Sequence, residues 1–200
     1  MKLLNNNDFV HMTWNEYQVH IDSIYKAIKT FISENGITID YIIPIMRGGA
    51  IPAISLSYLL NVVPIGILQL KHDYRKSSID IISNFLPHID RSAKYVLMID
   101  GYHASGKTSY KAYDMIIAAL PDVKIIYATL GRDVGYKENK RDFAFSYSAF
   151  YSNECGVIPK EESEKEGILT KYTLFPWEII EDEVKNMNDE LIYEGKLCIQ

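Results

Sequence analysis

One apolar run in the second half of the chain constrains the fold more than any other segment. The run Tyr95–Ile99 ends in Asp100, and a short loop rich in small and polar residues then opens a helical pattern over Gly106–Leu120. A continuous apolar run of this length is typical of a strand buried on both faces, as in a parallel sheet covered by helices. The segment therefore predicts a strand–loop–helix unit with a carboxylate at the carboxyl end of its strand.

Further patterns of the same kind lie on both sides of this unit. Strands are expected at Tyr41–Ile45, Pro64–Leu70, Val123–Thr129 and Phe143–Phe150, and helices after the capping box Thr13–Glu16, at Ala50–Leu60 and at Ile179–Asn186. Alternating strands and helices predict an α/β fold, a mainly parallel twisted sheet flanked by helices, with a small C-terminal hood. We expect a single domain over residues 1–200, with an exposed insertion at about 145–170. The polar segment Lys71–Ala93 is predicted to be a long loop or a hairpin that covers the site as a lid.

Composition narrows the classes of function. The 200 residues carry a net charge of −5, without the basic stripe that nucleic-acid binding usually requires. The most apolar stretch, 51–70, is interrupted by two prolines and a glycine, so we expect no membrane segment. The two cysteines are far apart, and the first residues lack the apolar core of a secretory signal. These features predict a cytoplasmic protein.

The segment from Asp100 to Thr108 has the chemistry of an anion site. Free backbone amides and the helix dipole attract phosphate to the start of a helix, and a glycine such as Gly106 allows close approach. Ser105 and Thr108 add hydroxyl donors, while Asp100 could hold ribose hydroxyls or a metal. The alternative is an ordinary tight turn before a capped helix.

A second interpretation of this segment is a P-loop. Residues 101–108 fit the pattern G-x-x-x-x-G-K-[ST] of nucleoside triphosphatases and kinases, with Lys107 as the phosphate-binding lysine. P-loops usually follow the first strand of their domain, whereas half of an α/β domain precedes this one. No apolar strand ending in aspartate follows to supply the second magnesium-binding motif.

The same residues also resemble the sugar-diphosphate signature of type I phosphoribosyltransferases. In this resemblance Asp100 takes the first acidic position, and residues 104–108 bind the 5′-phosphate. The earlier segment 43–52, with Arg47, Gly48 and Gly49, is similar to the pyrophosphate loop of the purine enzymes. Met12–His20 resembles the opening helix of bacterial xanthine–guanine phosphoribosyltransferases, and Tyr172–Glu178 resembles their aromatic Phe-Pro-Trp-Glu ending.

This resemblance, which covers roughly residues 12–135 and 170–180, implies an activity. The chain would transfer ribose 5-phosphate from phosphoribosyl pyrophosphate (PRPP) to a nucleobase, expected to be a purine, and release pyrophosphate. Asp100 is the expected catalytic residue and a contact for Mg²⁺, and a homodimer is expected because such dimers are common in the family. The expected substrate-binding residues are Arg47, Gly48, Gly49, Tyr102, His103, Ala104, Ser105, Gly106, Lys107, Thr108, Arg132, Tyr172 and Trp177.

Several of these roles follow from single positions of the resemblance. Tyr172 would stack on the purine, and Arg132 occupies the position where the family has a lysine that reads the exocyclic oxygen. Trp177 would line the base pocket or pack in the core. Two positions depart from the family pattern: Gly101 replaces the second acid, and Ala104 replaces the aspartate of the 6-oxopurine enzymes. These departures leave open a non-catalytic sensor that binds PRPP or a nucleotide without turnover.

Overall fold

A six-stranded sheet forms the centre of the protein. The computed structural model describes residues 3–62, 64–136, 141–154 and 156–194. The strands stand in the order β4-β3-β2-β5-β6-β7, and all neighbours are parallel except the antiparallel pair β3–β4. Their bounds are β2 (Tyr41–Met46), β3 (Leu68–Asp73), β4 (Ser78–Asn84), β5 (Tyr95–His103), β6 (Lys124–Asp133) and β7 (Phe145–Ser152). The predicted α/β class, with a mainly parallel sheet flanked by helices, is confirmed.

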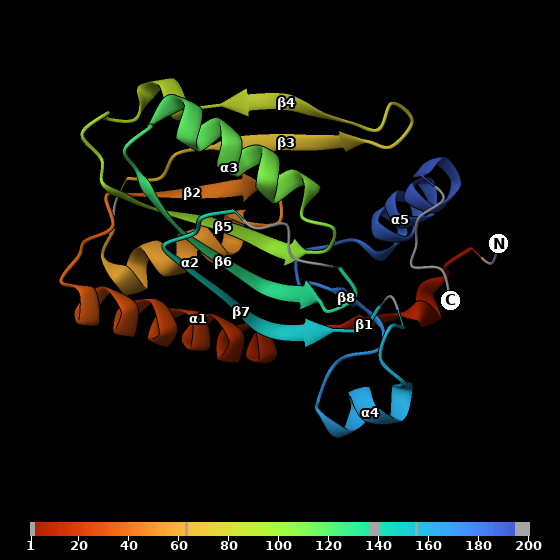
Figure 1. Ribbon diagram of the computed structural model, residues 1–200. Coiled ribbons are helices and arrows are strands. Elements are labelled where there is room, and N and C mark those ends of the chain that lie inside the picture. The colour runs from red at the N-terminus through yellow and green to blue at the C-terminus, as the bar shows by residue number, and fades with distance from the viewer. Residues whose placement is uncertain (1–2, 63, 137–140, 155, 195–200) are drawn as a thin grey trace.

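Helices cover both faces of this sheet (Figure 1). On one face, α1 (Trp14–Asn35) and α2 (Ala50–Leu60) bury their isoleucines and leucines against β2, β5 and β6. On the other face, α3 (Lys107–Ala119) packs with β3 and the short 3-10 helix η2 (Leu86–His88). The predicted capping box begins α1, since Thr13 Oγ1 accepts from the Glu16 amide at 3.2 Å and Glu16 Oε2 accepts from the Thr13 amide at 2.6 Å.

The connections place a switch point between β2 and β5. From β2 the chain passes through α2 to β3 on one side, and from β5 it passes through α3 to β6 on the other side. Because β2 and β5 are adjacent and parallel, their two following loops separate at the carboxyl edge of the sheet. Open α/β sheets bind ligands in the crevice at such a point.

A small second layer lies beyond this carboxyl edge (Figure 1). It consists of a two-stranded parallel sheet, formed by β1 (Phe9–His11) and β8 (Tyr172–Leu174), and of the helix α5 (Ile180–Glu194). The 3-10 helix η1 (Asn6–Asp8) directly precedes β1. The Asn188 side chain joins α5 to the N-terminal segment, since it accepts from the Leu4 amide at 2.8 Å and donates to the Leu4 carbonyl at 3.1 Å. We call β1, β8, α5 and the residues between β8 and α5 the hood.

Some elements differ from their predicted bounds. Strand β3 begins only at Leu68, and Ile65 makes a single bridge to Ile42. The segment 71–93 contains the end of β3, all of β4 and η2, so much of it is a paired hairpin. Helix α5 is longer than the expected 179–186.

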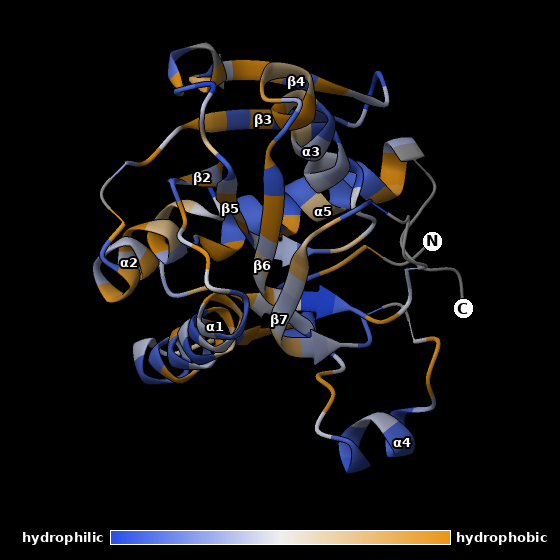
Figure 2. Ribbon diagram, turned by 60° about the vertical axis from the view of Figure 1, so that its left-hand side comes forward, coloured by the Kyte–Doolittle hydropathy of each residue, from blue (hydrophilic) through white to orange (hydrophobic). Residues whose placement is uncertain are grey.

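The stretch 145–170 divides into two parts. It begins with β7, the edge strand of the main sheet, and only the residues after β7 leave the sheet. They include the short helix α4 (Lys160–Lys165), which is hydrophilic and stands apart from the sheet (Figure 2). Among the described residues, no helix combines the length and apolarity needed to cross a membrane.

Candidate functional site

The loop after β2 is pressed against strand β5. A Cβ atom on Gly49 would lie 2.2 Å from the carbonyl oxygen of Ile99. This distance is too short for any side chain, so only glycine fits at this position. The peptide bond between Met46 and Arg47 is cis. Glycine at position 49 therefore lets Arg47 and Gly48 lie directly beside the end of the apolar strand that the sequence singles out.

Asp100 meets this loop across the switch point. A Cβ atom on Gly48 would lie 3.3 Å from Asp100 Oδ1, and one on Gly101 would lie 3.1 Å from the Gly48 carbonyl oxygen. The Gly101 amide donates to Asp100 Oδ1 at 2.8 Å. The residue keeps some exposure, but burial of its carboxyl raises the pKa of Asp100 to about 7, against the opposing effect of the Gly101 hydrogen bond. The predicted pyrophosphate loop and the predicted catalytic acid are thus in contact.

The loop before α3 is shorter than the P-loop pattern requires. Strand β5 continues to His103, with Tyr102 opposite Gly131 and His103 opposite Arg132 in β6. Only residues 104–106 lie between strand and helix, and Lys107 already begins α3. Since Gly101, Tyr102 and His103 belong to the sheet, residues 101–108 do not form the single phosphate-wrapping loop of a nucleoside triphosphatase.

Two helices begin at this edge with their amides toward the crevice side. Gly49 precedes α2 and Gly106 precedes α3, and neither provides a side-chain cap. Neither helix has an acidic residue in its first turn, although acids are favoured there, and α3 has Lys107 instead. Helix N-termini of this composition suit two separate anionic groups, one on each side of Asp100.

Tyr102 and His103 face the interior rather than the loop. The Tyr102 hydroxyl is hydrogen-bonded to the Ser152 hydroxyl of β7. His103 is 6% exposed, and its Nδ1 lies 3.0 Å from the Tyr127 hydroxyl. Both side chains therefore contact neighbouring strands, while the turn of the loop consists of the half-buried Ala104 and Ser105 and the buried Gly106.

A second polar cluster closes the crevice beside β6 and β7. Glu154, just beyond β7, is hydrogen-bonded to Tyr102, to Ser152 and to the backbone of Thr173 in β8. Burial of this carboxyl raises the pKa of Glu154 to about 8, although the residue as a whole keeps some exposure. Asp133, 1% exposed, accepts from the Glu154 amide at 2.8 Å. The cluster thus connects the sheet to the hood.

The predicted base-binding residues border this cluster. Arg132 is at the end of β6, next to Asp133, and Tyr172 begins β8. Burial, followed by the charges of Glu154 and other neighbours, raises the pKa of Tyr172. The ring of Tyr172 contacts that of Phe9 in β1, with 5.6 Å between centroids.

Trp177 belongs to an aromatic group between the hood and α1. Its ring stacks on Phe175, with 5.2 Å between centroids, and meets Tyr17 edge to face at 5.3 Å. The indole Nε1 of Trp177 is buried without a hydrogen-bond partner among the described residues. This environment matches the core-packing alternative for Trp177, whose ring packs against the main core cluster.

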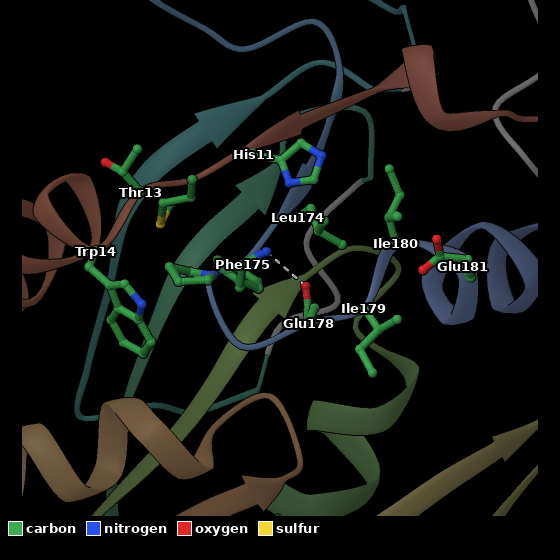
Figure 3. A pocket seen from close by; sticks show the side chains of 11 residues that line it. His11, Thr13, Trp14, Leu174, Phe175, Glu178, Ile179, Ile180 and Glu181 are labelled. Carbon is green, nitrogen blue, oxygen red and sulfur yellow. Dashed lines mark hydrogen bonds between the residues drawn. The ribbon is translucent and has the colours of Figure 1, made fainter.

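The hood carries a cavity of about 580 Å³ beside the crevice (Figure 3). It is lined by residues 11–14 and by residues 174–176 and 178–181, which include none of the predicted site residues. Glu178 connects the two places: it lines the cavity, accepts from the Phe175 amide at 2.9 Å, and interacts electrostatically with Arg47 and Asp100. We assign the site to the loops because they carry the charged residues and glycines that a phosphate ligand requires.

The Mg²⁺ ion expected at Asp100 fits this site only if a bound ligand supplies some of the oxygen atoms that coordinate it. Among the described residues, no group of three or more histidine, cysteine or acidic side chains is arranged to hold a metal ion. Mg²⁺ often keeps several waters and takes its other oxygen ligands from one or two carboxylates and from substrate phosphates. Asp100 can supply one such carboxylate, so Mg²⁺ would bind here together with a diphosphate.

Two acidic residues near Arg47 were not identified from the sequence. Burial raises the pKa of Glu178 to about 7, and the nearby Arg47 charge lowers it. Burial also raises the pKa of Glu183 in α5, again opposed by Arg47. Together with Glu154 and Asp133, these are polar residues that only the folded chain brings to the crevice. The one available signal was Glu178, which ends the Phe-Pro-Trp-Glu segment.

The sheet order, the switch-point loops and the hood define the type I phosphoribosyltransferase fold, and solved structures share it. The chain is similar to a purine phosphoribosyltransferase from Pyrococcus horikoshii, with a TM-score of 0.64 and 22% identity over 86% of this chain and 95% of that one. The xanthine–guanine–hypoxanthine phosphoribosyltransferase of Helicobacter pylori gives a TM-score of 0.62 and 16% identity, over 89% of this chain and 99% of that one. A hypothetical protein from Neisseria gonorrhoeae with bound ppGpp gives a TM-score of 0.61 and 18% identity, over 94% of this chain and 97% of that one.

These similarities concern structure. No family model matches the sequence, and no curated protein matches it. At such identities the comparisons establish the fold, while the reaction has to be argued from the site itself.

Proposed function

We propose that this protein is a phosphoribosyltransferase that moves ribose 5-phosphate from PRPP to a purine base. The observation that carries the proposal is the pair of anion-suited helix starts on either side of Asp100. PRPP has two anionic ends, a 5′-phosphate and a pyrophosphate, joined by a ribose. The purine phosphoribosyltransferases with this fold support the choice of base.

Each loop has a distinct role in this reaction. Arg47 and the amides of Gly48 and Gly49 bind the pyrophosphate, because a guanidinium offers fixed charge and several donors. The loop 104–106 and the first turn of α3, with Thr108, bind the 5′-phosphate. Asp100 then lies beside the ribose hydroxyls, and its carboxylate would help to hold Mg²⁺, which would supply charge neutralisation.

The chemistry requires positioning more than a protein nucleophile. The bond between the ribose C1 and the pyrophosphate oxygen breaks and pyrophosphate leaves, a bond from C1 to a base nitrogen forms, and the proton of that nitrogen passes to the released pyrophosphate or to water. Positive charge develops on the ribose, so the ionised carboxylate of Asp100 beside the ribose stabilises it electrostatically. Tyr172 and Arg132 hold the base at the hood side, and the hairpin of β3 and β4 excludes water as a lid.

The proposal is tested by binding and turnover together. Calorimetry with PRPP and magnesium, followed by pyrophosphate release in the presence of guanine, xanthine, hypoxanthine or adenine, should show binding and release with at least one base. We expect Arg47→Ala and Asp100→Asn each to weaken PRPP binding by at least about tenfold, since each removes a charged contact. Wild-type affinity in both variants would contradict the site assignment.

A non-catalytic sensor is the second candidate, and one observation favours it. Gly101 stands where the family has an acid, and any side chain there would crowd the Gly48 carbonyl, whose oxygen is only 3.1 Å from the Cβ position. Ala104 also provides no acid for the base. PRPP binding without pyrophosphate release for any base would support the sensor. The ppGpp bound to the Neisseria gonorrhoeae protein suggests including purine nucleotides among the sensor's ligands.

A further inference from the structure

A buried polar network lies beneath the loop 104–106. His103, the last residue of β5, turns its imidazole away from solvent, and its Nδ1 lies 3.0 Å from the Tyr127 hydroxyl and 3.2 Å from Ser109 Oγ. Tyr127 comes from the middle of β6 and Ser109 from the first turns of α3. Three different elements therefore meet at one imidazole directly below the loop.

The same network holds the other end of the loop. The Ser109 hydroxyl donates to the Gly106 carbonyl at 3.1 Å. Gly106 has φ 75°, a left-handed conformation that glycine adopts without strain, and a Cβ there would lie 2.3 Å from the Tyr110 ring. His103 in turn meets the Tyr110 ring edge to face, with 5.6 Å between centroids. The buried network thus contacts the loop at both ends, at His103 and at Gly106.

We infer that His103, Tyr127 and Ser109 are positioning residues that hold the loop 104–106 in the shape that binds a sugar phosphate. This inference rests on the proposed function, because it assigns the loop to the 5′-phosphate. The three side chains are buried under the backbone and act through it. Phosphate binding by amides needs donor–acceptor distances near 2.9 Å, so a small shift of the loop removes binding energy. Side chains that do not touch a ligand can in this way orient the groups that do.

The network predicts a selective loss of binding. We would titrate wild type, Tyr127→Phe, Ser109→Ala and His103→Gln separately with ribose 5-phosphate and with magnesium pyrophosphate. All three variants should lose about tenfold in affinity for ribose 5-phosphate, comparable to the loss when a group that orients a ligating residue is removed. Pyrophosphate binding should stay within about twofold, because Arg47, Gly48 and Gly49 lie on a different loop.

A conservative substitution provides the matched control. Asparagine at 103 keeps a polar atom close to the position of Nδ1, whereas glutamine places its polar atoms farther along the side chain. We therefore expect His103→Asn to retain most of the ribose 5-phosphate affinity that His103→Gln loses. Thermal unfolding of each variant reports whether it folds. If the His103 variants do not fold, Tyr127→Phe still tests the network, because it removes only one oxygen atom.

The outcomes separate this inference from the proposed function. If wild type binds both ligands and the variants lose neither, or lose both equally, the network has no specific role in the loop and the inference is overturned. If wild type binds neither ligand, the proposed function itself fails.

Discussion

Gly48 and Gly49 are neighbours in the sequence, yet the structure gives them unequal constraints. The Cβ of a residue at 49 would overlap two backbone carbonyls, those of Ile99 and Ile45, at 2.2 Å and 2.9 Å. At 48 the nearest atoms are Asp100 Oδ1 and the Gly101 amide nitrogen, both at 3.3 Å, so the neighbours need to move by only a few tenths of an ångström. One glycine is needed for the fold, and the other leaves space at the site.

This difference predicts unequal losses of stability. Gly49→Ala should lower the free energy of unfolding by at least about 3 kcal/mol, because strand backbone must shift to accept the methyl group. Gly48→Ala should cost less than about 1 kcal/mol. Urea unfolding of both variants measures the two values, and equal losses would mean that the loop is looser than the structure shows.

Residue-level reasoning from the sequence reached the charged loop but not the buried groups. Arg47, Gly48 and Asp100 were predictable because glycine and charge next to an apolar run have a local physical meaning. Glu154 and Asp133 were not, because their partners come from strands and from the hood and no spacing within the sequence links them. His103 was expected at the ligand, since the sequence does not reveal that β5 continues through it.

At the scale of elements, apolar runs predicted the parallel strands, whereas for residues 71–93 the sequence left a long loop and a hairpin as alternatives, of which the structure shows the hairpin. The core strands are buried on both faces and so have continuous apolar sequences, whereas β4 is an exposed edge strand with mixed residues. The turn of this hairpin reaches the hood, where the Arg75 guanidinium lies 5.2 Å from the centre of the Tyr193 ring. Hairpin and hood therefore touch across the mouth of the crevice.

This contact predicts how the hairpin moves. Tyr193→Ala should speed hydrogen exchange of residues 74–77 by about two- to fivefold, since an exposed cation–π contact contributes about 0.5–1 kcal/mol. Ile192→Ala, an exposed neighbour on the same helix, is the control and should leave that exchange unchanged. Mass spectrometry after deuterium labelling measures both. Unaltered exchange in Tyr193→Ala would show that the contact does not restrain the turn.

At the scale of the whole molecule, enclosed carboxyls link folding to pH. Burial raises the pKa of Asp100 and of Glu178 to about 7 and that of Glu154 to about 8. The unfolded chain releases these protons near pH 4, while the folded chain retains them to higher pH. The unfolded state therefore binds fewer protons in this window, and stability decreases as pH rises from about 4.5 to about 8.

Glu154→Gln should reduce this dependence. Glutamine cannot ionise, so the variant loses the part of the slope that comes from the burial of Glu154, and its stability relative to wild type should improve between pH 5 and pH 8 by an amount on the order of 2 kcal/mol. Urea unfolding at pH 5, 6.5 and 8 gives the comparison. Parallel curves for the two proteins would indicate that Glu154 is ionised throughout.

The parallel pairing of β1 with β8, and the Leu4–Asn188 hydrogen bonds that span 184 positions, have a consequence for the time course of synthesis. A ribosome releases the main sheet, with both of its loops, before it releases the residues that pair with β1. During that interval the loops exist without the hood, and the first segment waits with an unpaired strand edge. Contacts of such long range are also slow to form in refolding. The hood is therefore completed last, and a nascent chain that already resists proteolysis should still lack the completed candidate site.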